Sequence, residues 1–239
     1  MESSPSTTSE SMKMTATQWG GVVLLYLFIP FVLFACNGSV DWWQGWGFSI
    51  LIFLAGVGTR GGVEIRFPGL MAERLKWGKG RAVKAWDRVL APLMAISISF
   101  PLIIVAGLDH RYGWTVAFPL WVNLLGLAFI LFGYAFSSWA MLENRYFSSM
   151  VYIQMDRGHT VCDTGPYRYV RHPGYAGSAV SVIGIVLALN SLWTIIPAIL
   201  AFLVTLIRTT LEDRTLIKAL PGYREYSHRV ICRLFPGVW

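Results

Sequence analysis

Long uncharged apolar blocks separate the charged segments of this 239-residue chain. Hydrophobic residues make up 55% of the sequence, whereas charged residues make up only 14%. A helix needs about 20 apolar residues to cross a hydrocarbon core about 30 Å thick. Five blocks approach that length, namely 19–36, 42–58, 89–108, 114–142 and 176–207. This pattern predicts an all-α, polytopic integral membrane protein.

The two longest blocks decide how many times the chain crosses the membrane. The block 176–207 holds 32 uncharged residues, too many for one untilted crossing, and Asn190-Ser191 near its middle predicts a turn. A helical hairpin here gives about six transmembrane helices, whereas a single element gives five. The block 114–142 lacks a comparable polar break, so we expect one tilted helix there.

The basic residues predict the orientation of the chain. The segment 59–88 carries eight lysines and arginines against three acidic residues. Basic loops stay on the cytoplasmic side, so this segment, both termini, 143–175 and the tail 208–239 are predicted to be cytoplasmic. The formal net charge of +7 follows from this topology and from anionic lipid headgroups, and it requires no nucleic-acid partner. We divide the chain into a disordered tail (1–18), four transmembrane helices (19–142) and a C-terminal functional region (143–239).

Two sequence patterns, a glycine-rich motif and the three cysteines, do not predict a binding site. The sequence GVGTRG at 56–61 matches a dinucleotide-binding fingerprint, but Pro68 and Gly69 discourage the helix that must follow, and no acidic residue lies near position 80. We interpret it as a glycine-rich exit from the second crossing. Cys36, Cys162 and Cys232 lack the spacing of a metal site or a disulfide framework, so neither is predicted.

The stretch GPYRYVRHPGY (165–175) interrupts two strongly apolar regions. Gly165-Pro166 predicts a turn, and His172-Pro173 predicts a second break, because a residue before proline is biased out of the helical conformation. Tyrosine and arginine suit a membrane interface, so the stretch could serve only as an anchor. A backbone fixed by two prolines exceeds what an anchor needs, which favours a binding site.

A second cluster follows the last apolar block. Arg208 and Glu212 are four residues apart and share a helix face where that helix leaves the bilayer. They form either a surface ion pair or a functional pair, and their place at the membrane boundary favours the second. Tyr223 and Tyr226 follow a Pro-Gly turn and either stack on a flat ligand or pack on the membrane surface. The hairpin returns both clusters to one face, where they could enclose a pocket.

These residues carry a family resemblance. GPYRYVRHPGYAG, the Arg-x-x-x-Glu-Asp sequence at 208–213, GYREY and RVICRLFP together resemble the C-terminal half of the isoprenylcysteine carboxyl methyltransferase family. That family belongs to a wider group of membrane methyltransferases that includes phospholipid N-methyltransferases. The resemblance covers about residues 158–236.

The resemblance implies a site for S-adenosylmethionine (SAM) built without a Rossmann fold. It implies that the cofactor is bound by Gly165, Tyr167, His172, Pro173, Tyr175, Glu212, Tyr223 and Tyr226. It also implies that Arg208 and Glu212 are catalytic and lie beside the transferred methyl group. Asp213 departs from the family pattern, which usually has a second glutamate at this position, and its shorter side chain leaves its role open.

The expected function is SAM-dependent methyl transfer to a lipophilic acceptor, with the bilayer as partner and no metal. The acceptor is expected to be a carboxylate such as a prenylated cysteine, which Arg208 would orient while Glu212 holds the cofactor's amino group or a proton. Phospholipid amine N-methylation and thiol S-methylation remain alternatives. A sterol-type reductase that uses NADPH and a non-enzymatic membrane scaffold are further alternatives.

Overall fold

The computed structural model describes residues 13–75 and 82–239, whose regular elements are all helical. The long elements are α1 (Ala16–Asn37), α2 (Trp43–Arg66), α4 (Asp87–Tyr112), α5 (Leu120–Glu143), α6 (Pro173–Ala188) and α7 (Ile195–Ala219). The short elements are α3 (Leu70–Leu75), α8 (Tyr223–Arg229) and the 3-10 turns η2 (Met155–Arg157) and η3 (Gly165–Arg168). The predicted all-α fold is confirmed.

Five helices, α1, α2, α4, α5 and α7, are long and apolar enough to cross a membrane. The sixth apolar helix, α6, is shorter, with 16 residues. This arrangement agrees with the predicted polytopic membrane protein. Residues 1–12 of the predicted disordered tail and residues 76–81 of the basic segment lie outside the described residues.

The block 176–207 is a hairpin, as the sequence predicted. Helix α6 ends at Ala188, α7 begins at Ile195, and Asn190 between them adopts a left-handed backbone with φ 57°. Asparagine tolerates this conformation better than most residues, so the turn forms where Asn190 occurs. The single-helix alternative is therefore wrong.

Two boundaries differ from the prediction. Helix α5 begins only at Leu120, after Pro119, so the surplus length of the block 114–142 lies in a non-helical segment and does not require a tilted helix. Helix α2 continues to Arg66, so the glycines of 56–61 lie inside the helix and do not form its exit. Because of this extension, Arg60 lies inside α2, one of the helices long and apolar enough to cross a membrane.

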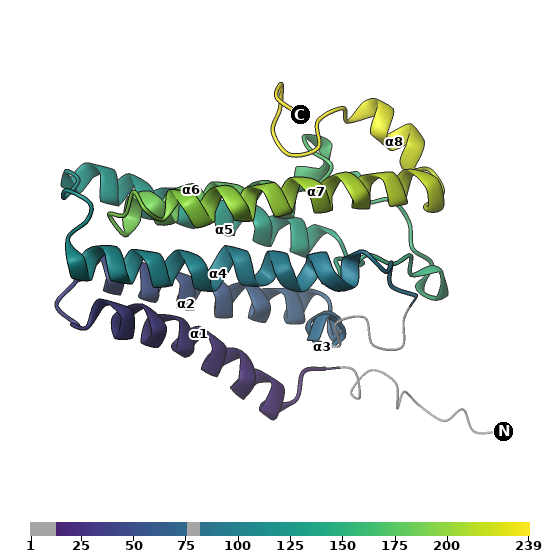
Figure 1. The fold of residues 1–239 in the computed structure, drawn as a ribbon. Coiled ribbons are helices and arrows are strands. Elements are labelled where there is room, and N and C mark those ends of the chain that lie inside the picture. The colour runs from purple at the N-terminus through teal and green to yellow at the C-terminus, as the bar shows by residue number, and fades with distance from the viewer. Residues whose placement is uncertain (1–12, 76–81) are drawn as a thin grey trace.

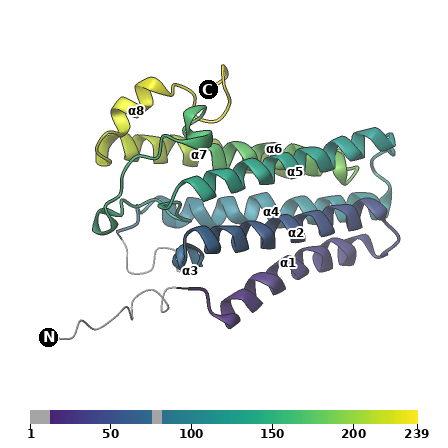
Figure 2. The same ribbon diagram turned by 180° about the vertical axis from the view of Figure 1, so that it is seen from behind.

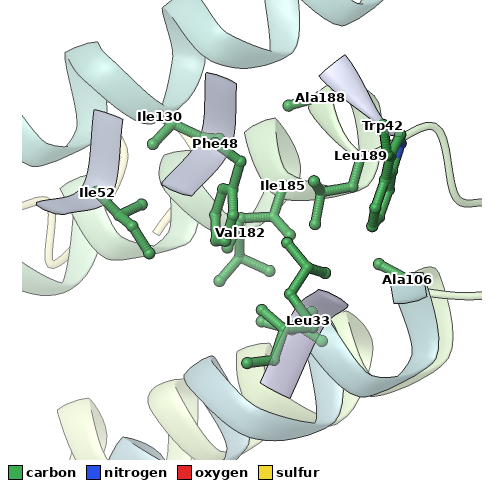
Figure 3. Packing of buried hydrophobic residues seen from close by; sticks show 12 residues of the cluster. Leu33, Trp42, Phe48, Ile52, Ala106, Ile130, Val182, Ile185, Ala188 and Leu189 are labelled. Carbon is green, nitrogen blue, oxygen red and sulfur yellow. The ribbon is translucent and has the colours of Figure 1, made fainter. Parts of the chain in front are cut away.

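Helices α5 and α6 pack closely through glycines. A Cβ atom added at Gly133 would lie 2.4 Å from the carbonyl oxygen of Gly177, and one at Gly184 would lie 2.6 Å from that of Gly126. Small residues allow such an approach in membranes, where helices associate by packing rather than by the hydrophobic effect. Figure 3 shows the adjoining core, in which Leu33 and other side chains from the neighbouring helices meet α6.

One end of the bundle collects the elements that carry the predicted site. The N-terminal end of α1, the short helix α3 and helix α8 all lie at this end (Figures 1 and 2). The opposite end carries the turn between α6 and α7. The cytoplasmic location of the first end stays a prediction.

Candidate active site

A cavity of about 500 Å³ lies among residues of the hairpin, the preceding helices and α8. Nearly all of the predicted site residues line it: Tyr167, His172, Pro173, Tyr175, Arg208, Glu212, Tyr223 and Tyr226. Gly165 is not among the lining residues. Its backbone is left-handed, with φ 54°, and an added Cβ would lie 2.9 Å from the side chain of Glu143, so Gly165 shapes the turn that begins η3.

Asp213, completely buried in α7, is the centre of the polar network beside the cavity. Its carboxylate accepts hydrogen bonds from Arg171 at 2.8 and 2.7 Å, from Arg233 at 3.0 Å and from the Tyr223 hydroxyl at 3.1 Å. The His172 Nε2 atom lies 3.3 Å from the same carboxylate. Asp213 thus connects α7 to the segment before α6, to α8 and to the C-terminal segment.

Arg171 connects that carboxylate to the C-terminal segment. Its Nη1 donates to the carbonyl oxygens of Val230 and Ile231, both at 2.7 Å, and its backbone N–H donates to Cys232 at 3.0 Å. Burial alone would lower the pKa of Arg171, but hydrogen bonds and the charge of Asp213 outweigh it and raise the pKa. Arg171 therefore stays charged and holds the last residues of the chain against the start of α6.

A second network joins Arg208 and Glu212 through a tyrosine. Arg208 donates to Asp87, at the start of α4, over 2.7 and 3.1 Å, and to the carbonyl oxygen of Ser149 at 2.9 Å. It also donates to the hydroxyl of Tyr175, which in turn donates to Glu212 Oε2 at 2.5 Å. Among the described contacts, Arg208 and Glu212 are thus coupled through the Tyr175 hydroxyl.

His172 lies between the two networks. Its ring stacks on that of Tyr175, with 5.8 Å between the centroids and 6° between the planes. It is buried, and its Nε2 atom lies near Asp213. The His172-Pro173 break predicted from the sequence is the N-terminus of α6, since His172 is the N-cap and Pro173 the first helical residue.

Three tyrosines that line the cavity, Tyr167, Tyr223 and Tyr226, are buried. Tyr223 and Tyr226 contact each other edge to face at 5.3 Å, and the Tyr226 hydroxyl donates to the carbonyl oxygen of Tyr167 at 2.7 Å. Burial raises the pKa of Tyr167, Tyr223 and Tyr226, which keeps all three hydroxyls protonated at neutral pH. Both α8 tyrosines therefore pack inside the protein and not on a membrane surface.

The lining of the cavity is partly apolar. It includes Val22 and Leu25 of α1, Ala91 and Ala95 of α4, and the methionines Met14, Met71, Met94 and Met141. Methionine side chains are flexible and adapt to apolar ligands of irregular shape. One cavity therefore combines tyrosines and charged side chains with apolar and methionine side chains.

Sequence reasoning missed three residues that organise the site. In the sequence, Asp87 is only one acid in a basic segment, Arg171 belongs to a stretch typical of a membrane interface, and Asp213 has no assigned role. Asp87 and Asp213 are both completely buried, and each binds an arginine from another segment. Buried carboxylates normally require such partners, but one sequence does not reveal which aspartates become buried.

This chain is similar to known methyltransferases. Residues 121–221 match the family model described as phospholipid methyltransferase, and this segment contains most of α5, all of α6 and α7, and every residue of the Arg208–Tyr175–Glu212 network. A solved structure of the eukaryotic intramembrane Ras methyltransferase ICMT (isoprenylcysteine carboxyl methyltransferase) is 15% identical. The alignment covers 97% of this chain and 89% of that one, with a TM-score of 0.46. No curated protein matches the chain.

The family match overlaps the segment that carries the resemblance up to residue 221, and GYREY and RVICRLFP lie beyond it. It includes the His172-Pro173 break, the charged positions 208–213 and the hairpin that brings them together. Residues 121–221 of this chain thus match a family of membrane methyltransferases, in agreement with the resemblance seen in the sequence.

Proposed function

We propose that this protein transfers the methyl group of SAM to a lipophilic acceptor inside the cavity lined by the hairpin, the preceding helices and α8. The observation that carries the proposal is the Tyr175 hydroxyl, which joins Arg208 to Glu212. These groups line the same cavity as the buried tyrosines and the methionines. A water-soluble donor and an apolar acceptor thus have adjoining surfaces in one compartment.

The polar side chains that line the cavity fit the chemistry of SAM. Its volume of about 500 Å³ falls within the usual range for cofactor pockets, about 300–1,000 Å³. The donor carries a cationic sulfonium and an ammonium group, and Glu212 Oε1 accepts no hydrogen bond among the described contacts. Tyr167, Tyr223 and Tyr226 supply aromatic and hydroxyl surface for a nucleoside. The donor, when bound, supplies a methyl group already activated by its sulfonium.

The protein's own contribution is positioning and the exclusion of water. Aligning two reacting groups accounts for about 7–11 kcal/mol of a barrier in favourable cases. We propose that the Glu212 carboxylate either binds the cationic donor or accepts a proton from the acceptor. Arg208 has its N–H groups directed to Asp87, Tyr175, Ser149 and the Met94 sulfur. Its role is therefore to hold Tyr175 and, through it, Glu212.

The apolar side chains that line the cavity favour an acceptor with a lipid tail. A carboxylate acceptor such as a prenylated cysteine arrives as an anion and needs no base for its attack on the methyl group. The family description, phospholipid methyltransferase, favours instead the amine of a phospholipid headgroup as a second candidate. An amine acceptor must lose a proton, for which Glu212 is the available base.

Product analysis with a methyl-labelled donor tests the proposal and separates the acceptors. Purified protein is incubated with labelled SAM and either an S-prenylated N-acetylcysteine or phosphatidylethanolamine. Label released as methanol by base indicates a methyl ester, whereas base-stable label in the lipid headgroup indicates N-methylation. Glu212→Gln should abolish most transfer, and Glu225→Gln, on the exposed face of α8, should not. Absence of label in every acceptor class, thiols included, would contradict the proposed function.

A further inference from the structure

Besides Arg171, which pairs with Asp213, and Arg208, two arginines line the cavity. Arg60 lies near the C-terminal end of α2, and Arg74 lies in α3. Arg208 is already neutralised by the buried carboxylate of Asp87. The question is which anion balances the charges of Arg60 and Arg74.

Neither guanidinium forms an ion pair with a carboxylate among the described residues. Arg60 donates to the Tyr26 hydroxyl and, at 3.2 Å, to the carbonyl oxygen of Gly56. Arg74 donates to the carbonyl oxygen of Phe147 at 3.3 Å. Glu64, one helical turn after Arg60, accepts instead from the backbone N–H groups of Met14 and Gly69, each at 3.0 Å.

Aromatic rings hold both guanidinium groups in place. The Arg60 Cζ atom lies 4.9 Å from the centroid of the Tyr26 ring, and that of Arg74 lies 4.8 Å from the centroid of Phe147. Arginine stacks well on aromatic faces and keeps its N–H groups free at the edge of the guanidinium plane. Each side chain is therefore oriented, while several of its donors remain without protein acceptors among the described contacts.

The two cations lie close enough to affect each other. Burial and the charge of Arg60 lower the pKa of Arg74 to about 10, so Arg74 remains charged at neutral pH. Both arginines are half-buried, and cations that are partly removed from water without a counter-ion gain from a bound anion. Arg60 and Arg74 line the same cavity as Tyr175 and Glu212.

We infer that Arg60 and Arg74 form an anion-binding subsite for the carboxylate or phosphate group of the acceptor. This inference rests on the proposed function, because it assigns these two residues of the same cavity to the binding of the acceptor. The planar donors of arginine match either anion through paired hydrogen bonds. The methionine-lined surface beside them, including Met71 and Met141, would hold the apolar tail.

Binding measurements on the full-length protein in detergent test the subsite without requiring turnover. One pair of probes is an S-farnesyl N-acetylcysteine and its neutral carboxamide, which tests a carboxylate. The other pair is phosphatidylethanolamine and diacylglycerol with the same chains, which tests a phosphate. In at least one pair, we expect wild type to prefer the member that carries the carboxylate or the phosphate by about tenfold or more.

The variant R60Q/R74Q should reduce that preference to about threefold or less, since the paired charge-assisted hydrogen bonds are lost. Arg74→Lys keeps the charge without the fork and should retain an intermediate preference. Arg66→Gln is the matched control, because Arg66 lies exposed on the same helix and stacks on Phe67 at 5.5 Å. It should leave the preference unchanged.

The inference is overturned if wild type shows no anion preference in either pair, or if R60Q/R74Q keeps the full preference. SAM binding is measured on the same preparations. If SAM still binds while the anion preference is absent or insensitive to the arginines, the subsite is wrong and the proposed function stands. If wild type binds no SAM, the proposed function fails, and the subsite loses its basis with it.

Discussion

Two completely buried aspartates, Asp87 and Asp213, determine where the charged side chains of the site lie. Asp213 holds Arg171, Arg233, His172 and Tyr223, and Asp87 holds Arg208. Removing one partner of such a group leaves uncompensated charges in a low-dielectric environment. The shorter side chain at position 213, which left its role open in the sequence, is long enough to contact segments on both sides of the hairpin.

Asp213→Asn should lower the free energy of unfolding by about 3–5 kcal/mol, because Arg171 then remains buried without its anion. Thermal unfolding in detergent measures the effect. Asp163→Asn is the matched control, since Asp163 pairs with Arg229 at the surface, where such a pair contributes about 1 kcal/mol or less. Equal losses in the two variants would contradict the central role of Asp213.

His159 makes the cavity wall sensitive to acid. Its Nδ1 atom accepts the Gln154 backbone N–H at 3.2 Å, and its ring packs on Tyr146 with 4.4 Å between the centroids. Burial, helped by Arg157, lowers the pKa of His159 to about 4. The unfolded chain, with an ordinary histidine pKa of about 6.5, binds the proton more readily. Stability therefore falls as the pH decreases from about 6.5 towards 4.

His159→Asn should weaken this acid sensitivity, because the amide oxygen can accept the same hydrogen bond and does not titrate in this range. Thermal unfolding of both proteins at pH 7 and pH 5 makes the comparison, and titration of all other groups is common to both. We expect the loss between the two pH values to be smaller in the variant. An equal loss would show that His159 does not contribute.

At the scale of the elements, the contact between α5 and α6 positions the whole site. The segment before α6 carries Arg171 and His172, and α6 itself carries Tyr175, so a shift of α6 would move all three. The glycines of the two helices fix this contact, because added Cβ atoms at Gly126, Gly133, Gly177 and Gly184 would lie within 3 Å of the facing helix.

Gly133→Ala should destabilise the protein by about 1–3 kcal/mol through overpacking against Gly177 and Ser181. Gly58→Ala is the matched control, because Gly58 lies inside α2 with nothing within 4 Å of an added Cβ. That change should be neutral or stabilise the helix by up to about 1 kcal/mol, the difference in helix propensity. Thermal unfolding of both variants checks the contrast, and similar effects would contradict close packing at Gly133.

The elements were predictable where a local signal marked their ends. Asn190 signalled the turn of the hairpin, and His172-Pro173 signalled the start of α6. Helix α2 extends past its predicted end because residues beyond Gly58 contact a neighbouring helix: the Thr59 hydroxyl lies 2.5 Å from that of Ser138 in α5. Such a tertiary contact overrides the weak helix propensity of glycine and is not visible in the sequence.

At the scale of the whole molecule, the hairpin brings residues far apart in the sequence into one cavity. This part of the site was predictable, since helix alternation alone returns 176 and 207 to one end. The partners Asp87 and Ser149 were not predictable, because they approach Arg208 only through the packing of α4 and the loop after α5. The same packing adds Arg60 and Arg74 to the cavity.

We propose that this cavity binds SAM through groups held by the Tyr175–Glu212 contact. Calorimetric titration of the purified full-length protein with SAM tests it most directly, with Glu212→Gln and the exposed control Glu225→Gln titrated in parallel. We expect one saturable site per chain in wild type and in Glu225→Gln, and an affinity reduced about tenfold or more in Glu212→Gln. Absence of SAM binding in wild type, or binding of NADPH in its place, would contradict it.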